Sequence, residues 1–376
     1  MSPSPLTEAP PHRAGAGPVS LPPIRLLIVD DSAVARAVFA RMVGSRPEFE
    51  IAATVASAAA ALDFLAGARV DIILLDIEMP GQDGLTALPA ILAASAGARV
   101  LIVSSSAEQG AVATIRALTL GAADTLAKPG ASAFGGRFAD VLAEKLLRLG
   151  RAAHAPCVRP AADAGGDGAG AEAVAARLRP LAEGPIDCLA VGASTGGLHA
   201  LSELLGALPT GFAAPILITQ HLPPAFMSFF AAQIAEMARR PAEVARPGAR
   251  ILSGRCYVAP GIGHLGVETV GGAVRIRITD ERVASGCMPS VDPMFMSVAE
   301  IYGPRALGVV LSGMGRDGAL GAARLADSGA SVVAQTRDTS VVWGMPGAVV
   351  SAGLASAVLP PRQIAELIAR RHRAAA

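Results

Sequence analysis

Short apolar runs alternate with helix-like segments over residues 24–148. Between the runs, apolar residues recur at the three- and four-residue spacing of an amphipathic helix. The runs that predict strands are 24–29, 51–55, 71–75, 100–103 and 124–127. Five strand–helix units in about 125 residues predict a doubly wound parallel sheet. In such a sheet, functional residues lie at the carboxyl ends of the strands.

A second strand–helix series begins at residue 186. Its apolar runs are 186–191, 215–219, 309–311 and 331–334. Between residues 241 and 280 the pattern changes to short strands with glycine turns, and Gly271-Gly272 separates two alternating runs, which indicates a β-hairpin. We therefore expect a second α/β domain with a parallel sheet and an antiparallel hairpin added to it.

The length and the low-complexity segments predict two domains. The chain has 376 residues, and a domain usually takes about 150. Residues 1–23 hold seven prolines and are expected to form a disordered tail. Residues 161–170 contain only Ala, Asp and Gly, which cannot build a core. We expect a first domain at 24–148, a linker at 149–185 and a second domain at 186–376. Within the linker, residues 171–182 are a candidate for a short helix.

Charge and cysteine usage exclude several classes of protein. The net charge is only +1, which argues against binding to nucleic acid or to an anionic membrane surface. The most apolar window, 341–359, contains Pro346 and three glycines, so we interpret it as buried core and expect no membrane insertion. No signal peptide is indicated, and the four cysteines are scattered, so we expect a cytoplasmic protein without a disulfide framework.

Polar residues follow four strands of the first domain. They are Asp30-Asp31-Ser32, Asp76, Ser104 and Lys128-Pro129. Three carboxylates at one sheet edge repel each other unless a cation binds, and oxygen ligands suit Mg²⁺. An Asp carboxylate can accept a phosphoryl group, with a lysine and a hydroxyl binding its oxygens. Lys128 is one of only two lysines in the chain.

These residues, in this order and spacing, resemble a response-regulator receiver domain. The resemblance implies that Asp76 is the phosphoacceptor and that Asp30, Asp31 and Asp76 form the Mg²⁺ pocket. It implies phosphate-binding and switch roles for Lys128 and Ser104, and a histidine kinase as phosphodonor. The family usually has an aromatic residue just inside the fifth strand, where this chain has Thr125.

The second domain carries a pattern typical of a serine hydrolase. GASTGG at 192–197 follows a strand and precedes a helix, so Ser194 would be exposed on a sharp turn. A phosphate-binding glycine loop would have a similar pattern. As the base, His221 at a strand end is favoured over His199 and His264. Asp317 follows another strand and is the favoured orienting carboxylate, with the competitors Asp292 and Asp338 left open.

A wider set of motifs resembles the methylesterase domain of chemotaxis protein-glutamate methylesterases. The motifs are GASTGG at 192–197, TQHLPP at 219–224, PSVD at 289–292, GMGRDG at 313–318 and GMP at 344–346. The resemblance implies that Ser194 is the nucleophile, His221 the general base and Asp317 its orienter, with the Met314 N–H stabilising the oxyanion. The family often has a basic residue before PSVD, where this chain has Cys287-Met288.

The two resemblances together imply a phosphorylation-activated enzyme of receptor adaptation. The implied reactions are hydrolysis of glutamyl methyl esters on the cytoplasmic helices of chemoreceptors and deamidation of receptor glutamines, neither needing a cofactor. Three alternatives stay open: a transcriptional regulator, a scaffold with a vestigial triad, and a small-molecule esterase. The first lacks support, because the second domain has no basic stripe.

Overall fold

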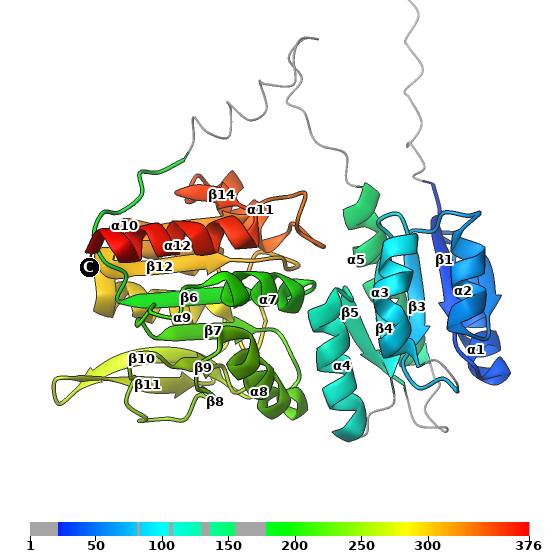
Figure 1. The fold of residues 1–376 in the computed structure, drawn as a ribbon, viewed down its shortest axis with the longest axis horizontal. Coiled ribbons are helices and arrows are strands. Elements are labelled where there is room, and N and C mark those ends of the chain that lie inside the picture. Colours follow the sequence, from blue (N-terminus) through cyan, green and yellow to red (C-terminus); the bar gives the residue numbers. More distant parts are fainter. Residues whose placement is uncertain (1–21, 81–82, 105–107, 129–135, 155–177, 376) are drawn as a thin grey trace, which may run out of the picture.

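The computed structural model describes residues 22–80, 83–104, 108–128, 136–154 and 178–375. It contains one sheet in the first part of the chain and two in the second (Figure 1). No helix within those ranges is long and apolar enough to cross a membrane.

The first sheet has five parallel strands in the order β2-β1-β3-β4-β5. The strands are β1 (Ile24–Val29), β2 (Phe49–Val55), β3 (Ile72–Asp76), β4 (Arg99–Ser104) and β5 (Asp124–Ala127). The helices are α1 (Ala33–Gly44), α2 (Ala58–Leu65), α3 (Gly84–Ala94), α4 (Glu108–Leu120) and α5 (Gly136–His154). All five predicted strands are present. β3 is buried at every position, as expected for a strand covered by helices on both faces.

The second domain is built on a seven-stranded parallel sheet in the order β14-β13-β12-β6-β7-β9-β8. Its strands are β6 (Cys188–Ala193), β7 (Ile216–Gln220), β8 (Ala242–Val244), β9 (Cys256–Val258), β12 (Ala306–Val310), β13 (Ser331–Gln335) and β14 (Ala357–Leu359). The strand order reverses between β6 and β12, and ligands of open α/β sheets bind at such a point. The loops after these two strands carry Ser194 and Asp317.

Helices cover this sheet, and the predicted antiparallel hairpin forms a separate two-stranded sheet in the same domain. The α-helices are α7 (Gly197–Ala207), α8 (Met227–Ala238), α9 (Val291–Tyr302), α10 (Ala319–Asp327), α11 (Met345–Ser351) and α12 (Pro361–Ala375). Two 3₁₀ turns are η1 (Pro224–Phe226) and η2 (Gly303–Arg305). The hairpin pairs β10 (His264–Val270) with β11 (Ala273–Thr279) in antiparallel register. Gly271 and Gly272 form its turn with positive φ angles, which favour glycine.

The segment before β6 is not helical where it is described. The helix considered for 171–182 lies partly outside the described residues, and residues 178–182 form no helix. The backbone N–H of Arg179 donates to the carbonyl of Ala355, and that of Ala182 to Ser331 Oγ. Since these donors bond to the second domain, they are not available for a helical ladder.

The two domains pack against each other through α4 and β5 of the first domain. α4 contacts α7 and α8 of the second domain (Figure 1). Ile115 and Leu118 of α4 belong to one buried apolar cluster together with Leu198 of α7. The first domain therefore covers the end of the second sheet from which α7 begins.

Candidate active site

Ser194 is held at the turn between β6 and α7 by its own backbone. Its N–H donates to the carbonyl of Ser312 at 3.0 Å. Its carbonyl accepts hydrogen bonds from the Gly197 N–H at 2.8 Å and from Gln220 Nε2 at 2.9 Å. These bonds connect the turn to the carboxyl ends of β12 and β7. The backbone of Ser194 is therefore fixed in place.

Two glycines allow the chain to approach Ser194 this closely. Gly196 has a φ of +75°, and a Cβ there would lie 2.5 Å from the Cβ of Val341. A Cβ on Gly313 would lie 2.9 Å from the Cβ of Ser194 and 2.3 Å from Sδ of Met345. Any larger residue at either position would push the loops apart.

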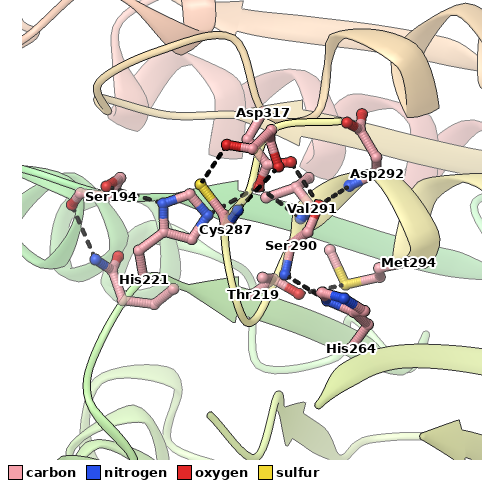
Figure 2. Close-up of polar contacts among 12 residues, drawn as sticks. Ser194, Thr219, His221, His264, Cys287, Ser290, Val291, Asp292, Met294 and Asp317 are labelled. Carbon is pink, nitrogen blue, oxygen red and sulfur yellow. Dashed lines mark hydrogen bonds and ion pairs between the residues drawn. The ribbon is translucent and has the colours of Figure 1, made fainter. Parts of the chain in front are cut away.

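A continuous hydrogen-bond chain joins Ser194, His221 and Asp317 (Figure 2). His221 follows β7, and its Nδ1 lies 3.1 Å from Ser194 Oγ. Its Nε2 lies 2.8 Å from Oδ2 of Asp317 in the loop after β12. Nδ1 therefore faces the hydroxyl and Nε2 the carboxylate. The structure brings the three predicted residues together in the arrangement of nucleophile, base and orienter.

Asp317 is almost completely buried and accepts three hydrogen bonds. Besides His221, Ser290 Oγ donates to Oδ1 at 2.5 Å and the Val291 N–H donates to Oδ2 at 2.8 Å. Burial alone would raise the pKa of Asp317, but the bonds and charge of His221, together with Ser290 and Val291, lower it to about 2. Its carboxylate is thus ionised over the whole physiological range.

His221 has a raised affinity for a proton. Burial lowers its pKa, but hydrogen bonding and charge from Asp317 and Cys287 outweigh burial and raise the pKa to about 9. Sγ of Cys287, a ring nitrogen of His221 and a carboxylate oxygen of Asp317 lie within 4.8 Å of one another. The sequence singled out Cys287 only as a departure from the family pattern, and its contact with the histidine is a new finding.

The remaining candidate bases lie outside this chain of bonds. His199 is exposed, and its Nδ1 lies 3.0 Å from the carbonyl of Thr119 in the first domain. His264 is buried, accepts from the Ser290 N–H through Nδ1 and donates through Nε2 to the carbonyl of Glu281. Its part is therefore structural support of Ser290.

The two other candidates for the orienting carboxylate, Asp292 and Asp338, occupy other positions in the domain. Asp292 lies at the start of α9, where its Oδ1 accepts from the Gly321 N–H at 2.8 Å. Burial and then the nearby charge of Asp317 raise the pKa of Asp292 to about 6. Asp338 lies in an exposed turn. Neither carboxylate forms a hydrogen bond with His221 within the described residues.

Met314 lies in the same loop as Asp317, directly after Gly313. Its side chain packs on the core of the first domain together with Val341. Its backbone N–H bonds to no group among the described residues. The structure thus places a free backbone donor one residue beyond the glycine that touches Ser194.

The predicted acidic cluster of the first domain is formed at the carboxyl ends of β1 and β3. One carboxylate oxygen from each of Asp30, Asp31 and Asp76 lies within 4.8 Å of the others. Lys128 Nζ lies 2.6 Å from Oδ2 of Asp76 and 3.0 Å from Oδ2 of Asp30. Burial raises the pKa of Asp76 despite the lysine. The bonds and charges of Asp76 and Asp30 outweigh burial and raise the pKa of Lys128.

The sequence also singled out Ser104 and Thr125 in the first domain, and these residues lie on β4 and β5. Ser104 ends β4, and its Oγ lies 3.0 Å from Oγ1 of Thr114 on α4. Thr125 on β5 is half-buried, and its N–H donates to Oδ1 of Asp124. Oδ2 of Asp124 accepts from Lys145 Nζ at 2.8 Å and from Thr195 Oγ1 at 3.3 Å. A carboxylate of the first domain therefore contacts the residue next to Ser194.

Comparison with known proteins identifies both halves of the chain. Residues 189–368 match the CheB methylesterase family, and residues 26–133 match the response regulator receiver domain. The chain is 40% identical to protein-glutamate methylesterase/protein-glutamine glutaminase 1 of Rhodospirillum rubrum, over 97% of each chain. The CheB methylesterase catalytic domain of Thermotoga maritima is 34% identical, over 49% of this chain and 98% of that domain, with a TM-score of 0.48.

Protein-glutamate methylesterase/protein-glutamine glutaminase 2 of Caulobacter vibrioides is similar over the whole of its own chain. It is 44% identical to this protein over 357 residues, which are 94% of this chain and 100% of the relative. The resemblances drawn from the motifs are thereby confirmed. The chain belongs to the CheB family of protein-glutamate methylesterases/protein-glutamine glutaminases, with a response regulator receiver domain preceding the methylesterase domain.

Proposed function

We propose that this protein hydrolyses glutamyl methyl esters on chemoreceptors and deamidates receptor glutamines, under control of its receiver domain. The observation that carries the proposal is the hydrogen-bond chain from Ser194 Oγ through His221 to Asp317. The names of the relatives, which join methylesterase and glutaminase activity, give the two reactions. Since chemoreceptor helices bearing these side chains lie in the cytoplasm, the protein would act there.

In the proposed reaction, Ser194 Oγ attacks the ester carbonyl while its proton moves to Nδ1 of His221. Asp317 holds the Nε2–H and stabilises the imidazolium that forms. Collapse of the tetrahedral intermediate expels methanol, which takes the proton from Nδ1. Water then attacks the acyl-enzyme by the same route and releases glutamate and the free serine. With a glutamine substrate, ammonia leaves in place of methanol.

The oxyanion of both reactions would be held by backbone donors. The N–H of Met314 is free, and its loop contacts Ser194 through Gly313. α7 begins three residues after Ser194, and the dipole at its N-terminus favours negative charge. No metal is required for either step, because the donors and the base are all supplied by the chain.

In the receiver domain, the proposed phosphoacceptor is Asp76. Mg²⁺ would be held by Asp30, Asp31 and Asp76, and the donor set fits, since all three ligands are carboxylate oxygens. Oδ2 of Asp30 is buried, and its contact among the described residues is the ion pair with Lys128 Nζ at 3.0 Å. When bound, Mg²⁺ neutralises the charge of the incoming phosphoryl group. Lys128 and Ser104 would bind the phosphoryl oxygens, and a histidine kinase would be the donor.

The packing of the two domains supports control by occlusion. The receiver contacts Thr195 and Gly196, directly after Ser194, and packs on Met314 in the loop that carries Asp317. The described arrangement would be the unphosphorylated form. Phosphorylation of Asp76 would shift the population toward a form in which α4 and β5 leave these loops.

The substrate is tested with membranes that carry methyl-labelled chemoreceptors, in parallel with a free aryl ester. We expect release of labelled methanol from the membranes. Hydrolysis of the aryl ester with no methanol release from receptors would replace the proposed function with that of a small-molecule esterase. Activity on neither substrate would contradict the catalytic proposal itself.

A further inference from the structure

Cys287 places a thiol beside the catalytic pair of His221 and Asp317. Figure 2 shows its sulfur next to the imidazole ring, on the side of Asp317. Sγ, a ring nitrogen and a carboxylate oxygen of the three residues lie within 4.8 Å of one another. The proposed ester hydrolysis uses His221 and Asp317 but gives the thiol no task.

The three side chains supply three different donor types, which is the composition of a zinc-class site. Thiolate sulfur and imidazole nitrogen select borderline and soft divalent cations, whereas the all-carboxylate cluster of the receiver suits Mg²⁺. Three protein ligands leave a fourth position for water. Only small movements are required, since the ligand atoms of a bound Zn²⁺ lie within about 4 Å of one another.

The cluster is accessible from solvent. Cys287 is half-buried, and the His221 side chain keeps 18% of its surface exposed. The other described cysteines, Cys188 and Cys256, are completely buried, and burial raises the pKa of both thiols. Cys287 is therefore the thiol that a cation from solution can reach among the described residues.

We propose that Sγ of Cys287, Nε2 of His221 and a carboxylate oxygen of Asp317 bind a zinc-class divalent cation that inhibits the esterase. The cation takes the place of the hydrogen bond between Nε2 and Asp317. Because the metal occupies the lone pair on Nε2, the ring proton stays on Nδ1, which faces Ser194. His221 then cannot accept the proton of Ser194. The binding site stands on geometry alone, whereas the inhibition rests on the proposed function.

Binding is measured on the full-length protein with Cd²⁺, whose thiolate complexes absorb in the ultraviolet. Cys157 lies outside the described residues and is replaced by Ser in the reference protein. Excess Mg²⁺ is included to compete for the receiver carboxylates, which give no thiolate band. We expect one equivalent of Cd²⁺ to produce the band and Zn²⁺ to displace it. Cys287→Ser and Cys287→Ala, with folding checked by circular dichroism, should each abolish the band.

Inhibition is measured on an aryl ester with the same proteins. Zn²⁺ should inhibit the reference protein reversibly, with recovery on adding a chelator, and Cys287→Ser should require at least about tenfold more Zn²⁺. A band that persists in both Cys287 variants, or no band in the reference protein, overturns the site. Equal sensitivity of the reference protein and Cys287→Ser to Zn²⁺ overturns the inhibition. A band with no esterase activity in any protein would instead sink the proposed function and leave the site standing.

Discussion

The backbone N–H of Gly196 donates a hydrogen bond to the carbonyl of Ala123, with 2.8 Å between the two atoms. Gly196 is two residues past Ser194, and Ala123 directly precedes β5 of the receiver. The bond therefore ties the receiver to the loop that positions the proposed nucleophile. Its donor is a backbone group of a glycine with positive φ, so the contact depends on the turn geometry itself.

Asp124→Asn should raise esterase activity in the absence of a phosphodonor. The carboxylate accepts from Lys145 and from Thr195, and loss of its charge weakens the closed arrangement of the domains. A loss of about 1 kcal/mol corresponds to roughly fivefold more of the open form. The readout is unstimulated methanol release. Asp63→Asn, at an exposed site on α2, is the matched control. Equal activity of Asp124→Asn and wild type would contradict the contact's role.

Ser290→Ala should lower kcat by about tenfold or more with little change in KM. Ser290 acts as a positioning residue, because it holds Oδ1 of Asp317 while Oδ2 faces His221. A buried hydrogen bond to a charged group contributes about 1.5–3 kcal/mol. Ser290→Thr should restore part of the activity. Ser297→Ala, at a buried serine of α9 that bonds Met294, is the control. A change in KM alone, or an equal fall in kcat in the control, would argue against a role of Ser290 in positioning Asp317.

The pH profile of hydrolysis should follow deprotonation of His221. Protonated His221 cannot accept the proton of Ser194, so kcat should rise about tenfold per pH unit and level off near pH 9, the value to which its pKa is raised. Cys287 is one of the groups that raise the pKa of His221, so Cys287→Ser should move the pH profile of kcat to lower pH. Rates are measured with a chelator present, and the hydroxide-catalysed background is subtracted with Ser194→Ala. An unchanged profile in Cys287→Ser would argue against the contact.

Asp76→Asn should abolish stimulation by a small phosphodonor while some unstimulated hydrolysis remains. The amide cannot form the acyl phosphate, although the pocket around it keeps Asp30, Asp31 and Lys128. Removing Mg²⁺ with a chelator should suppress stimulation of the wild type in the same way. Stimulation that survives the substitution would refute the role of Asp76.

The strand runs and their order along the chain predicted the first parallel sheet, four of the seven strands of the second (β6, β7, β12 and β13), and the hairpin. The site residues could be placed at one sheet edge for the same reason, because Ser194, His221 and Asp317 each follow a different strand. Their distances were not predictable, since they depend on loops whose course is set by Gly196 and Gly313. Hydrophobic periodicity shows which face of a helix or strand is buried, whereas the close approach of two loops depends on tertiary packing.

The parts that sequence reasoning missed are contacts between segments far apart in the chain. The support of Asp317 by Ser290 links residues 27 positions apart, and the contact of Asp124 with Thr195 links residues 71 positions apart. The PSVD motif signalled the first without revealing its partner. The short helix considered at 171–182 fails at 178–182, because the backbone donors there bond to the second domain instead.

The most direct test measures methanol release from methyl-labelled receptor membranes by wild type and Ser194→Ala, each with and without a small phosphodonor. The account predicts release by wild type, more release with the donor, and none above background with Ser194→Ala under either condition. Release by Ser194→Ala at the rate of wild type would contradict the assignment of Ser194 as nucleophile. Release by wild type that the donor leaves unchanged would contradict control by the receiver.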